Sequence, residues 1–205
     1  MDGVITMSMP LHYRAWARVF AGIGIKVSRF EVYRREGQKG LDSVMEISAK
    51  YGKPVTTAVA KELLLKKELF FKKIVHTRFV PGARRFIKQC HHRGLKTGLV
   101  TGTARHEVEK ILPEALIKAF DVIVCGSDVR NGKPHPEPYL KALKALKIAG
   151  GEALVIENAP FGITSAVKAG VRCVAIETSL PRRYLKEADH VVRNYTELKK
   201  FMKKI

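Results

Sequence analysis

The chain has 205 residues, of which 46% are apolar, so it can form one α/β core with an inserted segment or two small domains. It has no run of about 18 apolar residues and no basic-then-apolar N-terminal stretch, which argues against a transmembrane helix and a secretory signal. The formal net charge of +19 indicates either an anionic partner or a lysine-rich surface.

The basic residues are dispersed along the chain, as in the pairs at 66–67, 72–73, 84–85 and 199–200. A nucleic-acid surface requires a clustered basic footprint, so no specific nucleic-acid partner is expected. Side-chain amides are scarce beside abundant Lys and Glu, a composition typical of thermophile proteins. The cysteines Cys90, Cys125 and Cys173 are too far apart for CxxC spacing, which argues against a disulfide framework or zinc site and favours the cytoplasm.

From Pro10 to about Val75 the pattern is helical. Apolar residues recur near helical spacing and predict helices around residues 11–20, 41–48 and 63–74. Glycines and a proline punctuate these helices, and no strand pattern occurs here.

From Phe79 onward, short apolar strands alternate with helices. Strands are predicted at 97–100, 122–125, 153–156, 173–176 and 190–192, with helices at 83–93, 137–146 and 163–169. This alternation indicates a parallel sheet covered on both faces. Ligands of such sheets bind beyond the carboxyl ends of the strands, so the chemistry is expected there.

The first strand ends in Thr101-Gly102-Thr103. A hydroxyl and backbone N–H groups at a helix start can hold a phosphate, although a Thr at this place is often only a helix N-cap. Farther on, Lys133 stands between Gly132 and Pro134. It is either a fixed cation or an ordinary surface amine.

The third strand ends in Glu157-Asn158. A carboxylate directly after a buried strand is costly unless it is paired or binds a metal, so the alternatives are a metal ligand, an ion pair or a helix cap. The N-terminal Asp2-Gly3 pair alone is only a turn signal. Taken in order, the four motifs offer oxygen ligands for a hard cation, a fixed positive charge and a hydroxyl donor, as phosphoryl transfer requires.

With these motifs the sequence resembles the haloacid dehalogenase superfamily, and within it the β-phosphoglucomutase-like phosphatases. The resemblance rests on MDGVITMSMPLHYRAW, LVTGTARHEVEKIL, GKPHPEPYLKAL and VIENAPFGITSAVKAGV. It implies an α/β fold with a Rossmann-like parallel-sheet core and an inserted small helical cap domain. The implied division is 1–7 for the remnant of the first core motif, 8–77 for the cap and 78–205 for the core.

The family's first motif is Asp-x-Asp-Gly, in which the first Asp attacks phosphorus and the second is the general acid and base. Asp2 matches the second Asp and Met1 the residue between them. The nucleophile, and the central strand that carries it, would precede Met1. A clipped sequence, a start assigned downstream of the true one, or a degenerate enzyme would explain this. We expect one of the first two, because neighbouring strands would otherwise lack partners.

The resemblance also implies roles for the other residues. Thr101 would bind the transferring phosphoryl group, with Gly102 and Thr103 assisting, and Lys133 would neutralise nucleophile and phosphate. Mg²⁺ would be held by the backbone carbonyl of Asp2 and by Glu157 and Asn158, although the family usually has Asp at the last position. Among the polar cap residues, His12, Arg35 and Glu36 are the expected substrate-binding ones.

The resulting expectation is a cytoplasmic, Mg²⁺-dependent phosphatase for a small phosphorylated metabolite, in particular a sugar phosphate. A phosphomutase with the same core and a non-catalytic phosphometabolite-binding module remain as alternatives. No membrane partner is expected, and the protein is expected to be a monomer or a weak homodimer.

Overall fold

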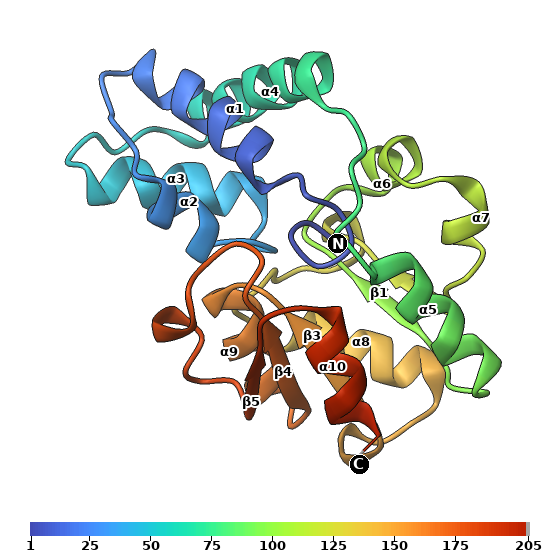
Figure 1. Cartoon of the computed structure of the whole chain (residues 1–205). Helices are drawn as coiled ribbons and strands as arrows, with labels where there is room; N and C mark the ends of the chain where they lie inside the picture. Colours follow the sequence, from blue (N-terminus) through green and yellow to red (C-terminus); the bar gives the residue numbers. More distant parts are fainter. Residues whose placement is uncertain (204–205) are drawn as a thin grey trace.

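The order of helices and strands is that of an α/β protein with a helical segment ahead of the sheet (Figure 1). The structure, a computed structural model, describes residues 1–203. Four helices come first: α1 (Met9–Ala21), α2 (Arg29–Arg34), α3 (Gly40–Lys50) and α4 (Thr57–Ile74). The remainder alternates, with α5 (Ala83–His92), β1 (Gly98–Val100), α6 (Arg105–Ile111), α7 (Glu114–Ile117), β2 (Val122–Val124), α8 (Glu137–Leu146), β3 (Leu154–Glu157), α9 (Pro160–Lys168), β4 (Arg172–Ile176), β5 (His190–Val192) and α10 (Tyr195–Met202).

The three predicted N-terminal helices correspond to α1, α3 and α4. Helix α2 was not predicted, because six residues are too short to display a 3.6-residue period. A local signal was present all the same. Ser28 caps α2 by accepting a hydrogen bond from the backbone N–H of Glu31, and a Ser followed three residues later by Glu is typical of a helix start.

The strands form two parallel sheets. One has the order β1-β2, with Gly98 opposite Val122, and the other has the order β3-β4-β5, with Leu154 opposite Arg172. All five predicted strands occur, and each of their bounds is within one residue of the prediction. Their near-continuous apolar sequences suit strands that are covered on both faces.

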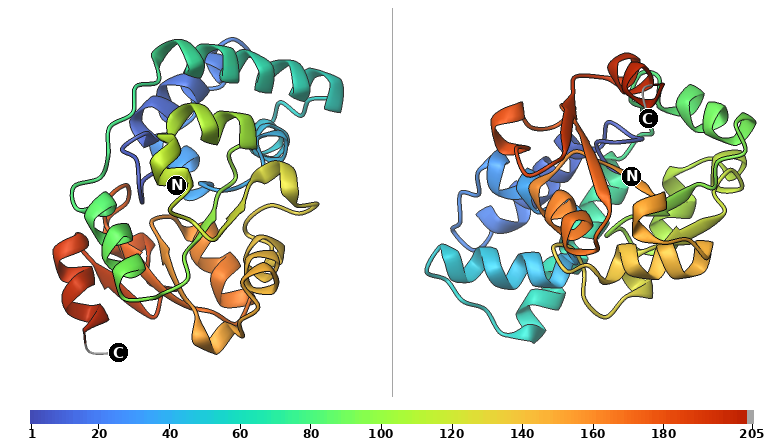
Figure 2. Two further views of the ribbon diagram at one scale, coloured as in Figure 1. Left: turned by 90° about the vertical axis from the view of Figure 1, so that its right-hand side faces the viewer. Right: turned by 90° about the horizontal axis from the view of Figure 1, so that it is seen from below.

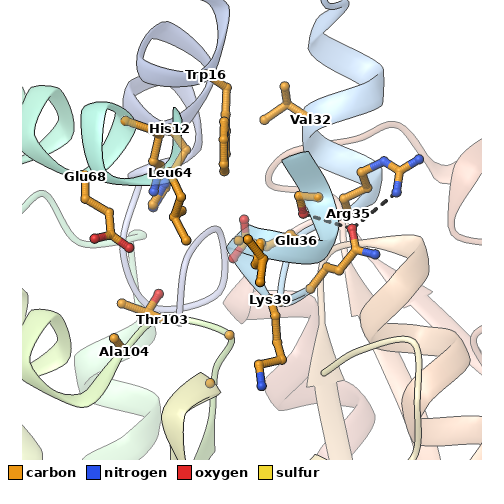
Figure 3. A pocket seen from close by; sticks show the side chains of 18 of the residues that line it. His12, Trp16, Val32, Arg35, Glu36, Lys39, Leu64, Glu68, Thr103 and Ala104 are labelled. Carbon is orange, nitrogen blue, oxygen red and sulfur yellow. Dashed lines mark hydrogen bonds between the residues drawn. The ribbon is translucent and has the colours of Figure 1, made fainter. Parts of the chain in front are cut away.

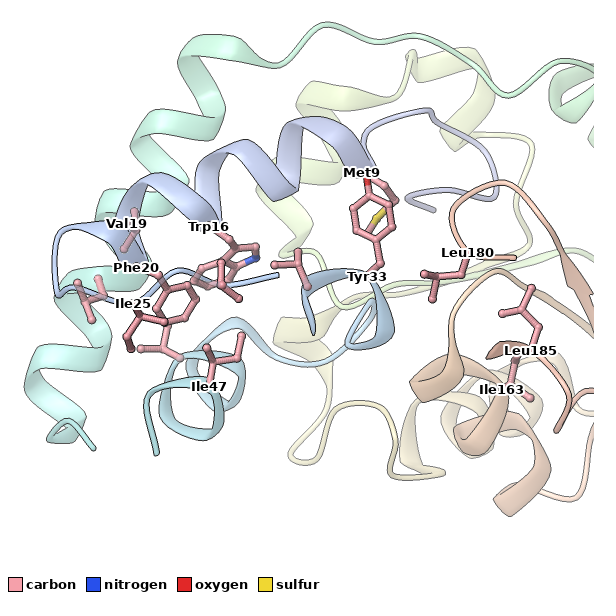
Figure 4. Close-up of a cluster of buried hydrophobic side chains, with 14 of the residues drawn as sticks. Met9, Trp16, Val19, Phe20, Ile25, Tyr33, Ile47, Ile163, Leu180 and Leu185 are labelled. Atoms are coloured by element: carbon pink, nitrogen blue, oxygen red, sulfur yellow. The ribbon is translucent and has the colours of Figure 1, made fainter. Parts of the chain in front are cut away.

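Helices α1–α4 form the helical cap, which lies to one side of the strands, with the N-terminus between the two parts (Figures 1 and 2). The largest apolar cluster continues from the cap into the core. Trp16 and Phe20 of α1 and Ile47 of α3 belong to it, together with Ile163 of α9 and Leu185 (Figure 4). The domain boundaries at residues 7/8 and 77/78 stay a prediction.

A glycine contact brings the cap close to the strand ends. A Cβ atom on Gly102, after β1, would lie 2.6 Å from the carbonyl oxygen of Gly37, in the loop between α2 and α3. Only a residue without a side chain permits this approach, so the cap loop covers the end of β1 directly. Across residues 1–203, no helix is both long and apolar enough to cross a membrane.

Candidate active site

The motif residues from the strand ends share one small cavity. Its lining comprises Met1, Asp2, Glu36, Gly37, Val100, Thr101, Gly102, Lys133, Glu157 and Asn158. Segments that are more than 150 residues apart in the sequence therefore meet, because the carboxyl ends of parallel strands lie at one edge of their sheets.

Asp2 is 1% exposed and holds three hydrogen-bond donors. The Ser8 hydroxyl donates to Oδ1 of Asp2, and Nε2 of the His12 ring lies 3.1 Å from the same oxygen. The Thr103 hydroxyl donates to Oδ2 of Asp2 over 3.1 Å. Burial acts to raise the pKa of Asp2, but the charge of His12 and its hydrogen bond outweigh burial and hold this pKa below its ordinary value. The carboxylate is therefore fixed in position and ionised in the unliganded site.

A tight turn delivers Asp2 to this position. Gly3 has a φ of +73°, and a Cβ atom there would lie 2.0 Å from Nδ2 of Asn158. Both the backbone conformation and the available space therefore require glycine. The Asp2–Gly3 peptide is consequently packed against the Asn158 side chain.

Lys133 is a buried, fixed cation, 4% exposed, so the surface-amine alternative is wrong. Its Nζ lies 2.5 Å from Oε1 of Glu157 and donates to the Val100 carbonyl over 3.2 Å. The Tyr139 hydroxyl also donates to Glu157 Oε1, over 2.6 Å. Although burial opposes it, the Lys133 charge lowers the pKa of Glu157, so the two residues form a buried ion pair.

Thr101 does not cap a helix. The N-cap of α6 is Ala104, which makes no side-chain bond, so the N-cap alternative for Thr101 is wrong. Its Oγ1 instead accepts a hydrogen bond from the backbone N–H of Thr103 over 3.2 Å, inside the loop that lines the cavity. No other hydrogen bond of this hydroxyl occurs within residues 1–203, so its proton can be donated to a bound oxyanion.

Asp2, Glu157 and Asn158 carry the oxygen atoms that could bind a hard cation. The Asn158 amide nitrogen faces Gly3 and donates to the Ser179 hydroxyl over 2.9 Å, and no hydrogen bond within residues 1–203 occupies the amide oxygen of Asn158. Glu157 Oε2 accepts only the neighbouring backbone N–H of Asn158 within residues 1–203. No group of three His, Cys, Asp or Glu side chains in that range could enclose a metal. This donor set suits Mg²⁺, which keeps several waters and shares its remaining positions with substrate phosphate.

A larger cavity of about 240 Å³ opens between cap and core (Figure 3). His12, Arg35, Glu36 and Thr103, all expected at the site, line it. The Arg35 guanidinium is held by Glu31 at 2.9 Å, by Gln38 at 3.2 Å and by Glu46, so this charge is already neutralised within the cap.

Several residues that complete the site were not found from the sequence. Ser8 holds Asp2, Tyr139 holds Glu157, and Lys67 lines the larger cavity. Lys67 and Phe71 lie four residues apart on α4, but in a helix with so many lysines that spacing alone could not distinguish a buried lysine from exposed ones.

Because of Glu36, the stability of the folded protein is expected to depend on pH. Burial, followed by the charge of Asp2, raises its pKa from 4.5 to about 7. The folded chain therefore keeps a proton that the unfolded chain releases, and the stability that Glu36 contributes is present below about pH 4.5 and lost as pH rises through about 7. Glu36→Gln, which stays neutral, should gain melting temperature over the wild type progressively from about pH 5 to about pH 8.

Thermal melts across that range check this expectation. The matched control is Glu62→Gln, at an exposed residue paired with Lys66, where the difference from wild type should not vary with pH. Parallel pH profiles for Glu36→Gln and the wild type would contradict the prediction.

Comparison with known proteins adds three findings. Residues 1–176 match the family model of haloacid dehalogenase-like hydrolases. The chain is 28% identical over 200 residues to the validoxylamine A 7'-phosphate phosphatase of Streptomyces hygroscopicus subsp. limoneus, covering 97% of this chain and 93% of that protein. It is 31% identical over 183 residues to the phosphorylated carbohydrates phosphatase of Thermotoga maritima, covering 83% and 79%.

A solved structure agrees in fold. The β-phosphoglucomutase of Clostridium difficile superposes with a TM-score of 0.85 at 23% identity, covering 99% of this chain and 92% of that chain. At this identity the likeness concerns the fold alone, a Rossmann-like core with a helical cap.

Proposed function

This chain belongs to the haloacid dehalogenase-like hydrolase family, and from that premise we propose that it is a Mg²⁺-dependent phosphatase of small phosphate monoesters, sugar phosphates in particular. The observation that carries the proposal is the single cavity that Asp2, Thr101 and the Lys133–Glu157 pair share. It combines a buried cation, a hydroxyl donor and a held carboxylate at the strand ends, which is what a transferring phosphoryl group needs.

In this proposal Lys133 and Thr101 stabilise the phosphoryl oxygens. Lys133 is aligned in advance by Glu157 and the Val100 carbonyl, so no reorganisation is needed when negative charge develops. Thr101 donates its hydroxyl proton, and the backbone N–H of Gly102 lies beside it in the same loop. The attacking carboxylate is assigned to an aspartate at the position before Met1, where the family motif has it.

Asp2 is the proposed general acid and base. A bound phosphate dianion raises its pKa, so that Asp2 can take up a proton and give it to the leaving oxygen. It then accepts a proton from the water that hydrolyses the phosphoenzyme. Ser8, His12 and Thr103 hold the carboxylate in one orientation through both half-reactions.

Mg²⁺ would be held by the Asp2 carbonyl oxygen, Asn158 Oδ1 and Glu157 Oε2, together with substrate and water. When bound, it supplies positive charge beside the phosphate. The neutral Asn158 offers an oxygen without a charge, so we propose a weak metal site that is filled together with the substrate.

Phosphate release by two proteins tests the function. One is the 205-residue chain. The other, called the aspartate-bearing protein below, is the same chain extended at its N-terminus by the residues encoded upstream, with an aspartate directly before Met1. The second should hydrolyse p-nitrophenyl phosphate and sugar phosphates, lose that activity with EDTA and regain it with Mg²⁺, whereas the first should be almost inactive. Equal rates would contradict the assignment of the nucleophile.

Product analysis separates the phosphatase from the phosphomutase. Free phosphate should accumulate from glucose 1-phosphate without glucose 6-phosphate. Isomerised sugar phosphate in excess over free phosphate would favour the mutase. If the aspartate-bearing protein forms neither product, the non-catalytic binding module is the remaining function.

A further inference from the structure

Helices α5 and α10 lie side by side on one face of the β3-β4-β5 sheet (Figure 2, left view). The Phe86 ring of α5 and the Tyr195 ring of α10 have centroids 5.4 Å apart, and both belong to an apolar cluster with Val174 and Ile176 of β4. Each helix therefore turns its apolar side inward, and the outward sides of the two helices form one surface.

This surface, called the α5–α10 face below, is strongly basic. Its cations are exposed, apart from the half-buried Lys199, and comprise Arg84, Arg85, Lys88, Lys199, Lys200 and Lys203. No Asp or Glu occurs from Leu69 to His106. The one carboxylate of α10, Glu197, accepts the backbone N–H of Arg193. None of the six cations belongs to an ion pair within residues 1–203, so the positive charge of the face is not balanced by the protein.

Folding creates this cluster, because more than 100 positions separate its two halves in the sequence. Elsewhere on the surface lysines pair with carboxylates, as Lys66 does with Glu62 and Lys118 with Glu114. A surface that serves only solubility or thermostability mixes the two signs in this way. A face of one sign repels itself in the folded state, which indicates an anionic partner.

The density of charge favours a nucleic-acid duplex as that partner. Helix α5 has 10 residues, so it is about 15 Å long. A duplex carries one phosphate charge per about 1.7 Å, or about nine over that length. An extended acidic peptide offers at most one carboxylate per about 3.3 Å, and ordering it on the face costs conformational entropy. The rigid, denser array of phosphates therefore suits the six cations better.

The apolar side chains of the two helices argue against other partners. A helix that binds a membrane surface inserts apolar side chains among the headgroups, but Phe86 and Tyr195 are buried within the protein, 8% and 3% exposed. Proteins that bind single strands stack unpaired bases on aromatic rings, whereas the remaining ring of α10, Phe201, stacks on His190. A second copy of the chain would bring like charges together.

We propose that the α5–α10 face binds the phosphate backbone of double-helical nucleic acid without sequence preference. Arg84 and Arg85 can each direct two parallel N–H groups at one phosphate, and the lysines add point charges. None of the six cations is among the residues that line either cavity, so this binding is a property separate from phosphate release.

Fluorescence anisotropy of a labelled DNA duplex of about 20 base pairs, titrated with the 205-residue chain from about 50 to 200 mM salt, tests the proposal. Two duplexes of unrelated sequence should bind equally, with a Kd of about 10⁻⁶–10⁻⁴ M near 0.15 M salt, the usual range for non-specific binding. With six phosphate contacts, the logarithm of the association constant should fall against that of the salt concentration with a slope of about −5.

The triple variant Arg85→Gln, Lys88→Gln, Lys200→Gln removes three of these contacts. Its slope should be less steep by about 3, and its affinity at about 50 mM salt should fall at least 100-fold. All three residues are exposed, so the fold should persist, and melting temperatures check this.

The matched control is the triple variant Lys61→Gln, Lys144→Gln, Lys168→Gln. It removes the same net charge from exposed residues of α4, α8 and α9 and should bind the duplex within about 3-fold of the wild type, with an unchanged slope. Phosphate release by the aspartate-bearing protein should be the same in both triple variants. A failure of the α5–α10 face and a failure of the phosphatase function are therefore distinguishable.

Absence of binding at about 50 mM salt would overturn the proposal, because non-specific backbone contacts are strongest there. Equal weakening in the two triple variants would also overturn it, since net charge alone would then explain the affinity. Tighter binding to phosphatidylcholine vesicles containing phosphatidylserine would assign the face to a membrane instead. Tighter binding to polyglutamate would assign it to an acidic protein.

Discussion

Replacing Lys133 with alanine in the aspartate-bearing protein should slow phosphate release by about 10²–10³-fold, the usual effect of removing one preorganised charge donor. The reason is geometric. Nζ of Lys133 is buried and fixed 2.5 Å from Glu157 Oε1, at the edge of the cavity that Thr101 and Asp2 line. Water that enters in its place must reorient as charge develops, whereas the lysine does not.

Steady-state kinetics of Lys133→Ala check this expectation, with Lys66→Ala as the control on the cap surface. The variant also leaves Glu157 buried without its cation, which typically costs about 3–5 kcal/mol of stability. Rates should therefore be compared well below the melting temperature of the variant. The double variant Lys133→Met, Glu157→Gln removes that buried charge and should recover stability but not activity. Activity near the wild-type rate in either protein would exclude Lys133 from the chemistry.

Asp2→Asn should slow hydrolysis of alkyl phosphates by about 10²–10⁴-fold, the range that general acid–base catalysis contributes. Asparagine keeps the shape of the side chain but cannot carry the proton to the leaving oxygen. The loss should depend on the leaving group. Nitrophenolate departs without protonation, so the first p-nitrophenol released from p-nitrophenyl phosphate should appear as a burst, followed by slow turnover because the water-activating base is also missing.

Rapid-mixing kinetics with the two classes of phosphate ester separate this role from a structural one. Because Asp2 accepts hydrogen bonds from Ser8 and Thr103, Asn at this position could disturb the turn. The control is Ser8→Ala, which removes one of those hydrogen bonds and should slow both classes of ester equally. The same uniform slowing in Asp2→Asn, without a burst, would contradict the acid–base assignment.

The elements of this fold could be predicted because they depend on local patterns. Five short apolar strands and the long helices carry their periodicity in consecutive residues. The strand bounds are within one residue of the prediction, whereas α4 begins at Thr57, six residues before its predicted start. Helix α2 lies below the length at which a period is visible, and only the Ser28 and Glu31 pair marks its start. The ordered motifs at the strand ends likewise pointed to one edge of the sheets, since parallel strands direct their carboxyl ends the same way.

The sequence by itself thus determined the α/β class, the helical cap and the set of strand-end residues that share the small cavity. What each of them contacts was decided only by the tertiary structure. Whether Lys133 is buried depends on Glu157, 24 positions away, and the orientation of Asp2 depends on Thr103, 101 positions away. Lys67 is one of many lysines in the sequence. Phe71 is its neighbour on α4, but only the packing of α4 against α1 adds the Trp16 ring beside its ammonium. Local pattern specifies which residues can form an element, but the burial and pairing of a charge are set by groups that folding brings from elsewhere in the chain.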